Sequence, residues 1–168
     1  MTQYRRIPAR WLPILLTATL SFQAGATQTG DEVKVSFHGV LKQKPCHIDS
    51  GRDIEVHFGN VGINKVDGSR YLQKVSYSLT CDDPDAGVAL MLSVKGTATG
   101  FDLAAVKTNA DGLGIRVLQE GKPFTLNSRM KITYKTPPKL EVVPVKDPNV
   151  TLVEKPFTAT ATLLAEYE

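Results

Sequence analysis

The sequence has few of the residues on which catalysis and cofactor binding usually depend. Its 168 residues include two cysteines, three histidines and one tryptophan, and aromatic residues make up only 7%. It carries no nucleophile elbow, no His-Glu-x-x-His zinc motif and no phosphate-binding loop. A zinc site needs about four ligands, and Cys46 and Cys81 stand far apart in the sequence. We therefore expect no enzymatic activity, no metal site and no cofactor.

The excess of positive charge is confined to the N-terminus. Three arginines precede an apolar run over residues 11–22, and small residues follow at 24–26. This order is typical of a secretory signal peptide, and we predict that residues 1–26 are removed. The 168 residues less these 26 leave 142, in which the 20 basic side chains fall by three to equal the 17 acidic ones. Because a neutral chain is not attracted to phosphate backbones, nucleic-acid binding is disfavoured.

Export also determines how the two cysteines are interpreted. An oxidising compartment allows thiols to pair, and Cys46 and Cys81 are the only two in the chain. We predict a structural disulfide between them, which would close a loop of about 36 residues.

The main pattern after residue 26 is alternation of apolar and polar residues in short runs bounded by Gly, Asn, Asp or Pro. Such runs are typical of half-buried strands, and no segment keeps a helical period over about twelve residues. Four prolines between residues 135 and 149 predict that any strand there is interrupted or lies at a sheet edge. The pattern indicates one all-β sandwich domain. The runs lie at 33–37, 54–58, 75–81, 88–94, 113–117, 130–134, 140–145 and 157–167.

The two ends of the 142-residue chain are alternating strands. Side chains at every second position share one face of a strand, which in the last run gives a small, apolar face. That face consists of Phe157, Ala159, Ala161, Leu163, Ala165 and Tyr167. The N-terminal run presents Val33, Val35 and Phe37 and precedes the first cysteine. Either both ends pair within one self-sufficient sandwich, or the N-terminal strand completes the sheet of another molecule.

The chain after the predicted signal peptide resembles, along essentially its whole length, a pilin subunit of the bacterial chaperone–usher pathway. The order of the matching elements and the placement of the cysteines carry this resemblance, together with the tyrosine next to the C-terminal residue. One position differs, because Lys155 stands where pilins usually carry a glycine. The matching elements are Val35-Ser-Phe37-His-Gly39-Val40, Pro45-Cys46, residues 54–61, residues 75–81, residues 113–117 with Gly121-Lys-Pro123, and the alternating run from Phe157 to Leu163 with Tyr167.

The resemblance implies an immunoglobulin-like β-sandwich that lacks its last strand and is completed by donor-strand complementation. Residues 27–38 would then form a donor-strand extension, with Val33, Val35 and Phe37 as its inserted side chains. Residues 39–168 would form the pilin domain, whose acceptor groove is bordered by the C-terminal strand. The resemblance further implies a periplasmic chaperone that holds the terminal carboxylate of Glu168, an outer-membrane usher, other pilin subunits as partners, and a place in a cell-surface fimbrium.

The position within such a fimbrium follows less directly from the residues. The proline-rich segment 135–149 and Lys155 favour a minor or adaptor subunit. A major shaft subunit and a base terminator stay open as alternatives, and so does a self-contained secreted immunoglobulin-like binding module.

Overall fold

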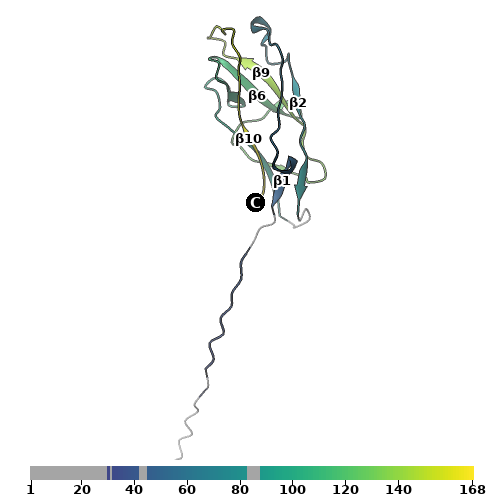
Figure 1. Ribbon diagram of the computed structural model, residues 1–168, viewed down its shortest axis with the longest axis vertical. Coiled ribbons are helices and arrows are strands. Elements are labelled where there is room, and N and C mark those ends of the chain that lie inside the picture. Colours follow the sequence, from purple (N-terminus) through teal and green to yellow (C-terminus); the bar gives the residue numbers. More distant parts are fainter. Residues whose placement is uncertain (1–29, 31, 42–44, 83–87) are drawn as a thin grey trace, which may run out of the picture. The chain divides into compact units, whose positions relative to one another are not determined.

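The computed structural model describes residues 30, 32–41, 45–82 and 88–168. The chain divides into two units, Met1–Val40 and Leu41–Glu168. The described residues of the first unit form neither helix nor strand (Figure 1). The predicted signal peptide, residues 1–26, lies outside the described residues. Within the described part of the chain, no helix is long and apolar enough to cross a membrane.

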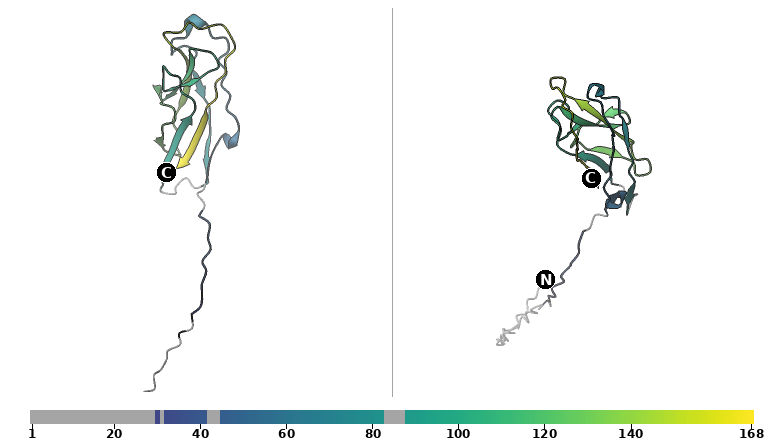
Figure 2. Two further views of the ribbon diagram at one scale, coloured as in Figure 1. Left: turned by 90° about the vertical axis from the view of Figure 1, so that its left-hand side faces the viewer. Right: turned by 45° about the horizontal axis from the view of Figure 1, so that its top comes forward.

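The second unit is built almost entirely from antiparallel strands, which confirms the predicted all-β fold. One sheet has the order β10-β4-β8, and the other has the order β2-β9-β6-β5, with β7 paired to β6. A separate pair joins β1 and β3. Figure 2 shows β10, in yellow, running beside β4. The strands are β1 (Cys46–Ile48), β2 (Gln73–Val75), β3 (Leu79–Cys81), β4 (Leu90–Lys95), β5 (Ala105–Lys107), β6 (Leu113–Gln119), β7 (Lys122–Pro123), β8 (Met130–Ile132), β9 (Leu140–Lys146) and β10 (Thr162–Tyr167). Two short 3-10 helices, η1 (Asp49–Gly51) and η2 (Ile63–Lys65), lie between β1 and β2.

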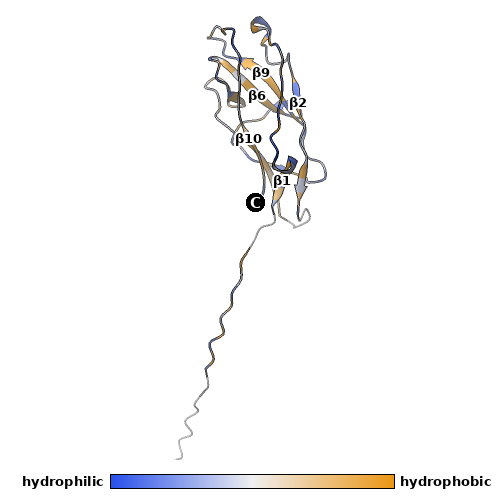
Figure 3. Cartoon of the chain, in the orientation of Figure 1, coloured by the Kyte–Doolittle hydropathy of each residue, from blue (hydrophilic) through white to orange (hydrophobic). Residues whose placement is uncertain are grey.

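The two sheets enclose an apolar core. Val94 of β4 packs with Val117 of β6 and Val142 of β9, and all three side chains are buried. β6 and β9 are accordingly coloured largely as hydrophobic in Figure 3. Burying such side chains contributes about 1.5–3 kcal/mol each before the loss of conformational entropy is counted. On this side of the sandwich, which we call the closed side, the two sheets cover each other's apolar faces.

The disulfide and a tyrosine fasten one end of this core. Cys46 and Cys81 stand opposite each other in the β1–β3 pair and are bonded, as predicted. Tyr77 lies between β2 and β3, and its hydroxyl donates a 2.7 Å hydrogen bond to the carbonyl of Pro138. Burial, with a smaller contribution from the Glu120 carboxylate, raises the pKa of Tyr77 to about 12. The phenol therefore stays neutral, and its proton stays in the hydrogen bond.

The prediction of an edge strand between residues 135 and 149 is wrong for the first half of β9. β9 lies between β2 and β6, and residues 140–142 pair on both sides. Pairing with β2 ends at Val142, so the second half of β9 has only β6 as a neighbour. Pro144 lies in that second half, opposite Ile115. The missing N–H of proline is accommodated because the strand is one-sided there.

Several predicted strand boundaries also differ from the structure. The runs at 33–37 and 54–58 are not assigned as strands, and the last strand begins at Thr162 instead of residue 157. The run at 75–81 is divided between β2 and β3. β1 and β5 were not predicted, since three residues are too few to display alternation. β7 pairs with β6 as a hairpin, which agrees with the resemblance of residues 113–117 and Gly121-Lys-Pro123 to a pilin hairpin. The unassigned run at 54–58 and the start of the run at 157–167 lie in the region of greatest functional interest.

Candidate functional site

Two stretches of the second unit run without forming a sheet. Residues 53–61, the first wall, and residues 151–161, the second wall, belong to no strand. Among the described residues, the main-chain groups of the first wall make no hydrogen bond, and those of the second wall make hydrogen bonds only at Thr158. Main-chain N–H and C=O groups nearly always find partners in a completed fold. We call the space that the two walls border the open groove.

The direction of the unpaired groups follows from strand alternation. Thr158 directs both its N–H and its C=O toward Asn109, and Glu168 donates its N–H to the carbonyl of Ala89. Even-numbered residues of this segment therefore point their main-chain groups into the domain. Phe157, Ala159 and Ala161 have the opposite parity, so their main-chain groups face the open side.

Both walls nevertheless pack on the core through their apolar side chains. Val56 and Phe58 of the first wall and Phe157 of the second contact the cluster that contains Val94. The rings of Phe58 and Phe157 lie 6.1 Å apart between centroids, tilted by 40°. Side chains of the two walls therefore contact each other at the floor of the groove, whereas no main-chain hydrogen bond among the described residues joins one wall to the other.

The groove contains a hollow of about 960 Å3, and Phe58 and Phe157 are among the residues that line it. Buried Val66 and Leu113 lie at its base together with Ala110, and these three residues form an apolar cluster. Leu152 and Val61 add apolar surface from the two sides. The hollow can therefore accept an apolar side chain from outside.

The rim of the hollow is polar. His57 on the first wall lies with its Nε2 3.4 Å from a carboxylate oxygen of Glu55, and both side chains are largely exposed. Glu154 and Lys155 border the opposite side. The Lys155 ammonium donates a 3.1 Å hydrogen bond to the carbonyl of Asn109. In the described part of the chain, no three His, Cys, Asp or Glu side chains gather as metal ligands.

The C-terminal residues singled out from the sequence differ in how far they are buried. Phe157 lines the hollow, Leu163 packs on the core, and Ala165 is buried beside Leu92. The remaining members of the alternating face differ from one another, since Ala159 and Ala161 are exposed and Tyr167 is partly buried. Glu168 is exposed as well.

The three N-terminal candidates lie in the first unit. The side chains of Val33, Val35 and Phe37 are 79%, 68% and 91% exposed. Large apolar side chains exposed at every second position are unusual unless a partner covers them.

Sequence reasoning did not identify the floor of the hollow or the residues that hold its walls. Ala110 and Leu113 share one turn, but Val66 comes from a distant segment, and nothing local in the sequence indicates that they meet. The alternation of Ile54, Val56 and Phe58 did mark the first wall, but as an ordinary strand.

The comparisons with known proteins give one consistent picture. The family model described as fimbrial protein matches residues 35–168. The uncharacterised fimbrial-like protein YfcQ of Escherichia coli is 35% identical over 158 residues, which cover 89% of this chain and 96% of that protein. The fimbrial adapter PapF of Escherichia coli is 32% identical over 89 residues, which cover 52% of each chain.

Solved structures agree. The P pilus adaptor subunit PapF superimposes with a TM-score of 0.54 at 28% identity, covering 74% of this chain and 96% of that one. The P pilus rod subunit PapA superimposes with a TM-score of 0.57 at 20% identity, covering 80% of this chain and all of that one (100%). The second likeness concerns the fold alone.

Proposed function

The chain belongs to the fimbrial protein family, a family of structural pilins and not of enzymes, and from this membership we propose that it is a minor or adaptor subunit of a chaperone–usher fimbria. It accepts a strand from a neighbouring subunit in the open groove. It gives its own N-terminal extension, residues 27–38, to the groove of another subunit.

The observation that carries this proposal is the pair of unpaired walls above an apolar floor. A strand laid between them would pair with the odd-numbered main-chain groups of the second wall and cover Phe58 and Phe157. An exposed edge of this kind is otherwise a site of aggregation. Strand addition is a known solution, in which main-chain hydrogen bonds supply affinity and alternate side chains supply specificity.

The donor is supported by the exposed run of Val33, Val35 and Phe37. Because they share one strand face, all three side chains can enter a groove together while the main chain pairs with the walls. Burying each contributes about 1.5–3 kcal/mol before ordering costs. Since strand exchange draws on this energy, polymerisation requires no nucleotide.

Two transient partners complete the proposal. A periplasmic chaperone covers the groove before assembly and binds the terminal carboxylate of exposed Glu168 through charge-assisted hydrogen bonds. An outer-membrane usher is the place of exchange. The subunit leaves the periplasm for the surface fimbrium.

The adaptor position is supported by the likeness to PapF, both in sequence and in structure. The likeness to the rod subunit PapA is one of fold alone, so a shaft position has less support than an adaptor position. A terminator would refuse a further strand, and the hollow of about 960 Å3 favours a groove that accepts one.

The test is periplasmic expression of the full chain with and without a candidate pilus chaperone, followed by size-exclusion chromatography and thermal melting. We expect aggregation or polymers without the chaperone and a one-to-one complex with it. A synthetic peptide of residues 30–40 should displace the chaperone and raise the melting temperature. The same peptide with Val35→Lys, which places a charge in the groove, is the matched control. A chain that is a stable monomer alone and ignores the peptide would instead be a self-contained binding module.

A further inference from the structure

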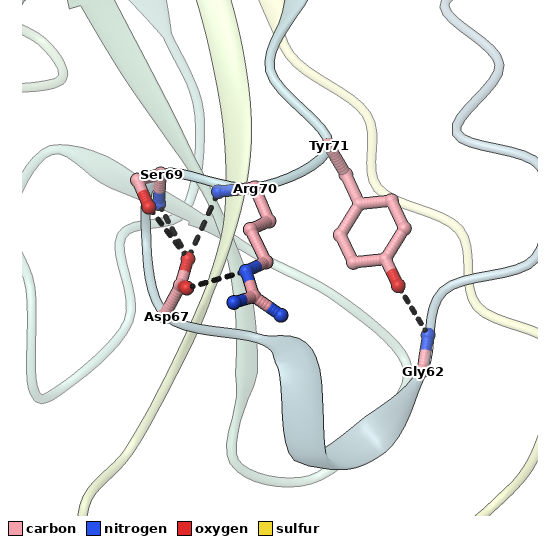
Figure 4. A network of polar contacts seen from close by, with 5 residues as sticks. All are labelled: Gly62, Asp67, Ser69, Arg70 and Tyr71. Carbon is pink, nitrogen blue, oxygen red and sulfur yellow. Dashed lines mark hydrogen bonds and ion pairs between the residues drawn. The ribbon is translucent and has the colours of Figure 1, made fainter.

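The end of the first wall is fastened by a side chain from a neighbouring turn. Gly62 donates its N–H to the hydroxyl of Tyr71 at 3.0 Å (Figure 4). Gly62 stands between Val61 and Ile63, which both line the hollow. Its hydrogen bond to Tyr71 therefore fixes the place where the first wall turns away from the hollow.

Tyr71 is itself positioned by a tightly bonded turn. One carboxylate oxygen of Asp67 accepts hydrogen bonds from the N–H groups of Ser69 and Arg70 and from the Ser69 hydroxyl, at 2.8–2.9 Å. The other lies 3.2 Å from the Arg70 guanidinium (Figure 4). Gly68 and Tyr71 have positive φ angles, +79° and 64°, so the chain reverses sharply and aims the phenol back toward Gly62.

The second wall is fastened by Asn109. Its N–H donates to the carbonyl of Thr158 at 3.2 Å, and its side-chain oxygen accepts the N–H of Thr158 at 2.9 Å. Its own carbonyl accepts the Lys155 ammonium at 3.1 Å. One residue thus imitates the edge of a neighbouring strand and satisfies both main-chain groups of Thr158.

The two fastenings stand at the same end of the groove. Tyr71 holds the first wall beside Val61 and Ile63, and Asn109 holds the second wall beside Phe157, with the hollow between. Elsewhere on the two walls the described main chain carries no such bond. Fixing a binding surface in advance lowers the ordering cost of association.

We propose that Tyr71 and Asn109 are positioning residues that hold the two walls of the hollow in place before a strand arrives. This inference rests on the proposed function. The residues act through Gly62 and Thr158 and do not themselves line the hollow.

The test uses the full chain, purified from the periplasm with its chaperone, and the peptide of residues 30–40. Tyr71→Phe removes only the hydroxyl, and Asn109→Ala removes the side-chain amide, whose oxygen is the acceptor for Thr158. We expect each to slow peptide uptake about threefold to tenfold with little change in peptide dissociation, the scale of one hydrogen bond. Asn109→Asp keeps the acceptor and should restore the rate. Tyr134→Phe and Asn149→Ala are the matched controls and should leave the rate unchanged.

Amide hydrogen exchange gives a readout that does not depend on uptake. The Gly62 amide should lose protection in Tyr71→Phe and the Thr158 amide in Asn109→Ala, while core amides of β4 keep theirs. Equal uptake rates in the variants and the wild type would overturn the inference, with the proposed function left intact. If the wild type takes up no peptide and forms no complex with the chaperone, the proposed function fails. If it forms that complex but takes up no peptide, the uptake step of the inference fails alone. Unchanged exchange at Gly62 and Thr158 would overturn the fastenings themselves.

Discussion

The closed interior between β4 and β6 and the open groove between the two walls are made from the same kind of sequence. Val94 follows Ser93 and Val117 follows Arg116 in alternating runs, as Val56 follows Glu55 and Phe58 follows His57 in the first wall. In the interior both sheets cover the apolar face, and neighbouring strands bind the main chain. At the groove the same face is half covered and the main chain is unpaired. Alternation therefore determines which face is apolar, but not whether a strand has neighbours.

The comparison is sharpest for a matched pair of leucines. Leu92 is completely buried between the sheets, and Leu92→Ala should destabilise the subunit by about 2–5 kcal/mol. Leu152 borders the hollow and is only partly buried, so Leu152→Ala should cost about 1 kcal/mol or less. Thermal melting of both variants measures the difference. Equal losses would mean that the groove is closed in solution.

The same pair responds differently once a strand occupies the groove. With the peptide of residues 30–40 bound, Leu152 becomes covered, so the cost of Leu152→Ala should rise while that of Leu92→Ala stays the same. A cost for Leu152→Ala that does not change on binding would contradict insertion beside the hollow.

The disulfide joins β1 and β3 at one end of the closed side, and its loss should have the next largest effect on stability. Replacing Cys46 and Cys81 together by alanine releases a loop of about 36 residues, and chain entropy predicts a loss of about 3–4 kcal/mol. Chemical denaturation of the double variant, beside the reduced wild type, measures this loss. A reduced wild type as stable as the oxidised one would show that the pairing of β1 and β3 holds without the bond.

The sequence allowed the closed half to be predicted better than the open one. Most of β4, β6 and β9 falls within the predicted strand runs, because their apolar faces meet a complete partner sheet. Residues 54–58 of the first wall and 157–161 of the second wall were predicted as strands, although pairing depends on neighbours that alternation does not reveal. The role of Asn109 was not visible at all, since its partner Thr158 is 49 residues away. Contacts over such distances are set by topology and not by local pattern.

A smaller effect is expected from Tyr77, on the closed side. Tyr77→Phe removes the hydrogen bond to the Pro138 carbonyl and should cost about 1 kcal/mol, whereas Tyr134→Phe should cost nothing measurable. The pKa of Tyr77 is raised to about 12 from its ordinary value of 10.0, so the neutral phenol stabilises the fold below pH 10. That contribution is lost as the pH rises through about 12. Denaturation curves between pH 9 and pH 12 should fall less steeply for Tyr77→Phe than for the wild type.

The smallest effect concerns the turn that positions the first wall. Hydrogen bonds from the Arg70 and Ser69 N–H groups, then from the Ser69 hydroxyl, lower the pKa of Asp67 from its ordinary value of 3.8 to about 2. The turn is therefore strengthened above pH 4, and this contribution disappears only as the pH falls through about 2. Protection of the Gly62 amide should stay constant from pH 8 to pH 4 once the intrinsic exchange rate is corrected for. Asp67→Asn removes the titrating group and should abolish the loss near pH 2, whereas Asp111→Asn, at an exposed position, should not. A loss of protection centred near pH 4 would mean that the carboxylate does not hold the turn, and the first wall would then depend on Tyr71 alone.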